Sequence, residues 1–249
     1  MPIWKDLRER MLLGGAVFAF VQVCLINIRF PMPALFERTI LEHFLRSDAT
    51  VNVTSSLLTG LISAYIFYIV IELLPRHSKE QSTLRILNLL VASIIDAYER
   101  TRIFGHETPI TSIDLSTLNA AKLDAHAQCV QKRVANFLKL KFAMETAHSR
   151  YPDVQHSLGL AASLSPEHAL EWLVYSDKVR LLAEVYGTQP KNPEIDDATG
   201  LPHVVQVFDK QHMFLQNQYT KAMDDLQSTL QMRVMEVMEA SARWVRFTS

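Results

Sequence analysis

The chain of 249 residues is short of glycine and cysteine and has no excess of charge of either sign. Its seven glycines leave no glycine-rich phosphate loop, which disfavours nucleotide-binding α/β folds, sandwiches and barrels. Cys24 and Cys129 are too few for a disulfide framework or a cysteine-ligated zinc site. Because 25 Lys and Arg are balanced by 26 Asp and Glu, a general nucleic-acid coat protein is disfavoured as well.

Sequence motifs that carry chemistry are also missing. There is no G-x-S-x-G, no H-E-x-x-H and no C-x-x-C. His126 and Cys129 share a predicted helix face, but two ligands are too few to hold zinc. We therefore expect no enzyme, no metal and no cofactor. The alternative, a membrane-bound enzyme of unfamiliar type, requires Asp124, His126 and Cys129 to meet around a pocket.

The hydrophobic residues gather in two long uncharged runs near the N-terminus. Residues 11–28 form a run of 18 and residues 49–71 a run of 23. Eighteen helical residues are ~27 Å long, close to the ~30 Å hydrocarbon core of a bilayer. The first run exceeds the apolar part of a signal peptide and has no small-residue cleavage site after it. We predict transmembrane helices over 11–28 and 51–71; the alternative is a buried hairpin in a soluble domain.

Basic residues predict the orientation of these two helices. Residues 1–10 and 72–100 together hold seven Lys and Arg, whereas residues 29–48 between the runs hold three. The excess of Lys and Arg lies on the cytoplasmic side of membrane proteins. We expect a membrane protein with two spans, both termini cytoplasmic and residues 1–10 as a cytosolic tail. The external segment 29–50 has the pattern of an amphipathic helix, either lying in the membrane interface or serving as a simple loop helix.

Small residues mark one face of each predicted span. In lipid, helices associate where small side chains let the backbones approach closely. We expect these faces to pack the hairpin, with self-association into a homo-oligomer as the alternative. Neither run contains an ionisable side chain, which disfavours transport by a single chain. The predicted packing residues are Gly15, Ala19 and Gln22 in the first span and Ser56, Gly60 and Ala64 in the second.

The remainder of the chain predicts a cytosolic helical domain over 72–187. Pro75 is expected to end the second span, and a polar stretch then leads into an apolar helix over 84–98. A helical region over 114–150 ends at a turn formed by residues 151–153. Ser165, Pro166 and Glu167 have the pattern of a helix start, and Gly187 that of its end.

The C-terminal part predicts a linker followed by one long helix. Residues 188–202 hold three Pro and one Gly, so we expect a linker there. Apolar residues then recur at helical spacing over 203–249 and predict a long helix. This helix packs within the domain or forms one strand of a coiled coil. The predicted fold class is all-α: a transmembrane hairpin, a cytosolic helical domain and a long C-terminal helix.

One stretch of the cytosolic part is locally basic. Residues 125–144 contain no acid, and Lys132 and Lys139 would share a face of a continuous helix. Such a patch is usually a solvated helix face; the alternative is contact with anionic lipid or with nucleic-acid phosphate. The residues of this patch are Lys132, Arg133, Lys139 and Lys141.

The run SLLTGLISAYIFYIVIELLPRHSK, residues 56–79, followed by an apolar helix, resembles small two-transmembrane effectors of bacterial phage-defence systems, including retron-associated ones. The resemblance implies a protein that depolarises or permeabilises the inner membrane when a guarding complex of reverse transcriptase and its RNA–DNA is disturbed. It assigns no role to any individual residue. The expected partners are membrane lipid and a protein or nucleoprotein complex. The alternative function is a membrane-tethered adaptor whose cytosolic domain docks such a partner.

Overall fold

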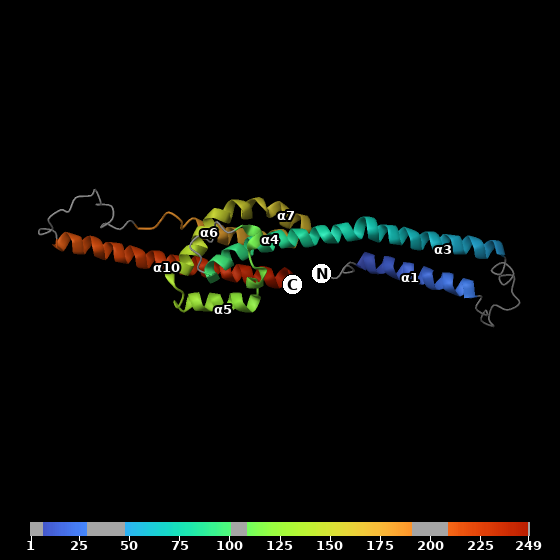
Figure 1. Ribbon diagram of the computed structural model, residues 1–249, viewed down its shortest axis with the longest axis horizontal. Coiled ribbons are helices and arrows are strands. Elements are labelled where there is room, and N and C mark those ends of the chain that lie inside the picture. The colour runs from blue at the N-terminus through green and yellow to red at the C-terminus, as the bar shows by residue number, and fades with distance from the viewer. Residues whose placement is uncertain (1–6, 29–47, 101–108, 191–208, 249) are drawn as a thin grey trace. The chain divides into compact units, whose positions relative to one another are not determined.

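The computed structural model describes residues 7–28, 48–100, 109–190 and 209–248, and these ranges contain helices, turns and connecting segments but no strand (Figure 1). The all-α prediction is therefore confirmed for the described part. The chain divides into two compact units, Met1–Gln81 and Ser82–Ser249. Most of the predicted external segment 29–50, and residues 191–202 of the predicted linker, lie outside the described residues.

The first unit consists of helix α1 (Leu7–Ile28) packed against helix α3 (Asp48–Tyr68). Ala16 and Ala19 are the buried apolar residues of α1, three positions apart on one face. On α3 the half-buried residues recur every three or four positions, as expected for one side of a helix. These α3 residues are Val51, Ser55, Leu58, Ile62 and Tyr65.

The helix of the second predicted span does not end at Pro75. Helix α3 continues through a π-helical turn, η2 (Ile69–Leu73), into helix α4 (Leu74–Arg100). The Leu74 N–H donates to the Ile69 carbonyl five residues earlier, which widens the backbone at this point. Proline has no N–H, and its ring clashes with the carbonyl of residue i−4 in a regular helix. The wider turn relieves that clash, so the polar stretch after Pro75 is helical rather than a break.

The second unit has one hydrophobic core. It is built from α4 and from α5 (Ala120–Gln131), α6 (Phe137–His156), α7 (Leu158–Leu164), α8 (Pro166–Ala183) and α10 (Asp209–Thr248). Trp172 and Trp244 lie at its centre with ring centroids 5.0 Å apart. The Trp172 indole N–H donates to the Val154 carbonyl at 3.0 Å, and that of Trp244 to Asn88 Oδ1 at 2.8 Å. Both large rings are thus buried with their polar group satisfied.

Short polar side chains begin three of these helices. Asn119 accepts N–H bonds at the start of α5, Asn136 does so for α6, and Ser165 accepts from the His168 N–H for α8. These bonds satisfy backbone donors that have no partner within the helix. The predicted α8 start is confirmed, and Gly187 adopts φ +84° in the turn after the helix. Short 3₁₀ turns η4 (Ile110–Ser112) and η5 (Leu115–Thr117) precede α5.

The predicted turn at residues 151–153 is wrong, because α6 runs through Pro152 to His156. The proline removes one backbone hydrogen bond, but a tertiary contact holds the end of α6: the Trp172 indole N–H of α8 donates to the Val154 carbonyl. The hydroxyl of Ser157, the residue after α6, donates locally to the same carbonyl. Tertiary contacts of this kind let the helix persist past a residue that would end it in isolation.

The predicted long C-terminal helix is present as α10, a helix of 40 residues. Its buried residues follow helical spacing and join the core of the second unit, as the packed alternative predicts. They include Leu226, Leu230, Val234, Val237 and Trp244. Residues 203–208, the predicted start of this helix, lie outside the described part.

Candidate functional site

The apolar side chains of the first unit point outward. Phe18 and Phe20 on α1, and Leu57 and Phe67 on α3, are each more than half exposed. Among the described residues one helix, Thr50–Arg100, is long and apolar enough to cross a membrane. Only 6% of its most apolar window, with a mean hydropathy of 2.1, is buried inside the protein. The core helix of a soluble domain is mostly buried, and this window is not.

The small residues predicted to pack the hairpin divide into two groups. Ala19 is buried and Gln22 half-buried, so both lie on the side of α1 that faces α3. Gly15 is exposed, and a Cβ built on it meets nothing within 4 Å. The structure therefore places Gly15 outside the α1–α3 contact.

The predicted face of α3 also lies outside this contact. Ser56, Gly60 and Ala64 are exposed, and Gly60 has open space around it. The half-buried side of α3 holds Ser55, Leu58 and Ile62 instead. The structure therefore does not pack the hairpin through Ser56, Gly60 and Ala64, and self-association through these residues stays a prediction.

The predicted basic patch does not lie on one helix. Lys132 and Arg133 occupy the turn that follows α5, and Arg133 has φ 59°. Lys139 and Lys141 lie on α6, where the Lys139 ammonium stands 5.5 Å from the centroid of the Tyr98 ring and Lys141 pairs with Glu145 at 3.7 Å. Burial raises the pKa of the Tyr98 hydroxyl, and Cys129 adds to the effect. Contact of this patch with phosphate or lipid stays a prediction.

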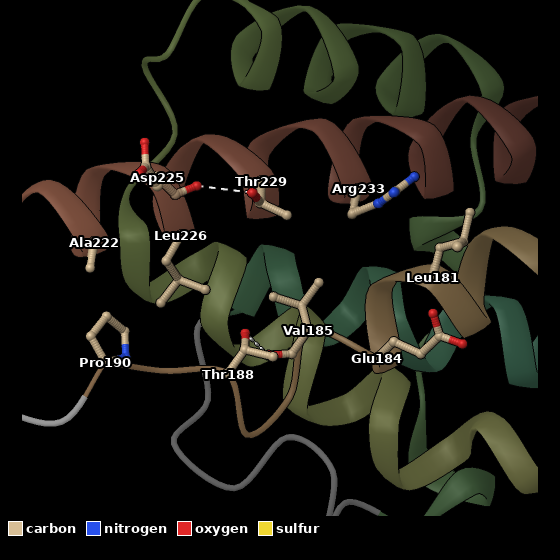
Figure 2. Close-up of a pocket in the computed structure, with 10 residues that line it drawn as sticks. All are labelled: Leu181, Glu184, Val185, Thr188, Pro190, Ala222, Asp225, Leu226, Thr229 and Arg233. Carbon is tan, nitrogen blue, oxygen red and sulfur yellow. Dashed lines mark hydrogen bonds between the residues drawn. The ribbon is translucent and has the colours of Figure 1, made fainter.

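A pocket of about 520 Å³ lies between the end of α8 and α10, as Figure 2 shows. Leu181, Val185 and Pro190 contribute apolar surface from α8 and the segment after it, and Ala222 and Leu226 contribute it from α10. The polar lining residues are Glu184, Thr188, Asp225, Thr229 and Arg233. Apolar and polar side chains are therefore mixed in the lining of this pocket.

Two of the charged residues at this pocket are paired: Glu184 with Arg180, and Arg233 with Glu236. Arg233 donates to Glu236 at 3.0 Å, and Lys178 on α8 donates to the same carboxylate at 3.1 Å. Burial alone would raise the pKa of Glu236, but these two hydrogen bonds outweigh it and the pKa is lowered. The Asp225 backbone carbonyl accepts the Thr229 hydroxyl at 2.9 Å. This pocket was not predicted from the sequence, because its residues come from two segments joined by a long connection.

The residues weighed for chemistry are not gathered around the pocket. His126 Nε2 lies 2.9 Å from Glu99 Oε1, Asp124 pairs with Arg246, and Cys129 is exposed. None of the three lines the pocket between α8 and α10 or a smaller one beside Tyr151. Among the described residues, no group of three or more His, Cys, Asp or Glu is placed to hold a metal ion.

Comparisons of the chain with family models, with curated proteins and with solved structures give no match. The candidate functions therefore rest on two features of the molecule itself. The first is the outward apolar surface of α1 and α3, and the second is the pocket between α8 and α10.

Proposed function

We propose that the chain is a membrane-anchored, non-enzymatic effector that perturbs or permeabilises the membrane in which it lies. The observation that carries the proposal is the contrast between the two units. The buried apolar residues of α1 and α3 are two alanines, and the large apolar side chains of these helices are mostly exposed. The second unit exposes single large apolar side chains such as Leu170, but it also buries many others in one core. Helix α1 has 22 residues and α3 has 21, so each is long enough to cross the hydrocarbon layer of a bilayer.

In this proposal α1 and α3 form two spans with both termini in the cytoplasm of a bacterial cell. The cytosolic helices hold the spans in an inactive arrangement until a trigger acts. Residues 1–10 and 72–100 hold more Lys and Arg than residues 29–48 between the spans, and this excess supports the orientation. The resemblance to phage-defence effectors supports the activity and makes a nucleoprotein with reverse transcriptase the expected partner.

Depolarisation after induced expression tests this function. The full chain is expressed in bacterial cells, and a dye reports the membrane potential. Leu57→Arg puts a charge on the outward face of α3, which costs about 2.5–3.5 kcal/mol at the centre of a span, so it should reduce depolarisation strongly. Leu170→Arg, at an equally exposed leucine of α8, is the control and should retain the effect. Unchanged potential under every trigger tested, in cells whose membranes hold the full chain, would contradict the proposal.

The pocket between α8 and α10 supports a second candidate, a membrane-tethered adaptor that docks a partner through its cytosolic helices. A chain that lacks residues 1–75 should then still capture the partner. Ala222→Glu puts a charge into the pocket and should abolish capture, whereas Lys221→Glu on the adjacent exposed position should not. Equal capture by both variants would remove the pocket from this candidate.

A further inference from the structure

Helix α3 carries a line of hydrogen-bonding side chains on its exposed surface. Asn52, Ser56, Thr59 and Ser63 are spaced by four, three and four residues, so they lie along one flank of the helix. Each follows by one position a residue that faces α1. One position is a rotation of ~100°, so this flank is turned away from the α1 contact. We call these four residues the polar flank.

The polar flank has unmet hydrogen-bonding capacity. All four residues are exposed, and within the described part of the chain none of their side chains makes a hydrogen bond. In hydrocarbon no water is present to satisfy an amide or a hydroxyl, so such groups gain from a partner helix. The relevant property of these four residues is their polarity rather than their small size. Alanine or glycine at the same positions would have no side-chain hydrogen-bonding group to satisfy in lipid.

The length of the polar flank favours a helix contact over a water-filled path. It covers 12 residues, or ~17 Å, whereas the hydrocarbon core is ~30 Å thick. Along the same line the next residues are Ile66 and Val70, which are exposed and apolar. This apolar stretch would interrupt a water-filled path partway across the membrane. Two packed helices can instead make apolar contacts there.

We propose that the partner of this flank is the same flank of a second copy of the chain. Copies inserted in one orientation present parallel flanks, and each hydroxyl can both donate and accept, so identical surfaces are complementary. The alternating spacing of four and three matches the left-handed crossing common between membrane helices. The inference rests on the membrane location in the proposed function and names the partner of α3 there.

Disulfide cross-linking in isolated membranes tests the inference. In a full chain carrying Cys24→Ser and Cys129→Ser, single substitutions Asn52→Cys, Ser56→Cys, Thr59→Cys and Ser63→Cys are compared with Val53→Cys, Leu57→Cys and Leu61→Cys. The first group lies on the polar flank, and the second is exposed on another side of α3. We expect at least about ten-fold more covalent dimer from the first group after oxidation. Equal yields, a maximum in the second group, or monomer throughout would overturn the inference.

Substitutions of Thr59 test whether the two polar flanks are hydrogen-bonded to each other or only lie close together. With Ser56→Cys as reporter, Thr59→Val keeps the side-chain shape but removes the hydroxyl, and dimer yield should fall about three- to ten-fold. Thr59→Ser should restore it, and Leu57→Ala should leave it unchanged. Equal yield from Thr59→Val and Thr59→Ser would overturn the hydrogen-bonded seam.

Membrane fractionation before oxidation separates this inference from the proposed function. A chain recovered in the supernatant overturns both. A chain that stays in the membranes but lacks the cross-linking pattern overturns only the pairing of polar flanks and leaves the membrane effector standing.

Discussion

At the scale of single residues, burial in the second unit determines how much each apolar side chain contributes. Leu230 and Met232 lie two positions apart on α10, yet Leu230 is fully buried and Met232 is 45% exposed. Removing a buried leucine side chain loses its transfer free energy and leaves a cavity. The neighbouring methionine leaves no cavity when it is truncated.

This contrast predicts the outcome of two alanine substitutions. Leu230→Ala should lower the free energy of unfolding by about 2–5 kcal/mol, whereas Met232→Ala should change it by less than about 0.5 kcal/mol. Urea unfolding of the full chain in detergent, followed by circular dichroism, measures both. Similar losses would mean that α10 does not bury Leu230 in solution.

The carboxylate of Glu236 predicts a pH effect. Its pKa is lowered in the folded protein, so it stabilises the fold above its unfolded pKa of about 4.3. That contribution is lost as the pH falls through the lowered folded pKa. Glu236→Gln should cost a few tenths to about 1 kcal/mol at neutral pH and flatten the acid limb of the stability curve.

The control for Glu236 is Glu239→Gln, at an exposed position on the same helix. It should leave the acid limb as in the unsubstituted chain. An equally steep acid limb for Glu236→Gln would show that the bonds from Arg233 and Lys178 do not form in solution.

At the scale of helices, the sequence predicts the start of α8 better than its end. The cap at Ser165 is found where expected, whereas α8 ends at Ala183, and the predicted stop Gly187 takes its positive φ in the turn that follows. Pro75 and Pro152 follow local rules for helix ends but do not end a helix. A π-helical turn accommodates the first, and a hydrogen bond from Trp172 holds the helix beyond the second.

The cap of α8 gives a prediction at this scale. Ser165 accepts the His168 N–H, whereas the hydroxyl of Ser163 bonds only within α7. Ser165→Ala should destabilise the folded chain by about 1 kcal/mol, and Ser163→Ala by clearly less. Thermal unfolding in detergent measures the difference. Equal midpoints for the two variants would contradict the assigned cap.

The packing of α1 and α3 shows where sequence reasoning stops. Small residues at spacing four predicted the contact face, yet Ser56, Gly60 and Ala64 are exposed while Leu58 and Ile62 are half-buried. Beyond Arg10, the exposed positions of α1 and those of α3 are apolar or uncharged polar, so hydrophobicity alone does not distinguish the two sides. The pocket between α8 and α10 was not predicted either, because its residues share no local pattern.

At the scale of the whole molecule, the two units differ in what their surfaces require. The second unit buries many large apolar side chains in one core and exposes single ones such as Leu170, as a domain in water does. The first unit leaves such side chains exposed on both helices. We therefore propose that water surrounds the second unit and lipid surrounds the first. The proposed effector function depends on this assignment.

Extraction of membranes at alkaline pH tests this assignment most directly. Cells that express the full chain are broken, their membranes are washed with sodium carbonate, and the chain is measured in pellet and supernatant. We expect the full chain to stay in the pellet until detergent is added, whereas a chain that begins at Ser82 should be found in the supernatant. Release of the full chain by carbonate alone would contradict the account.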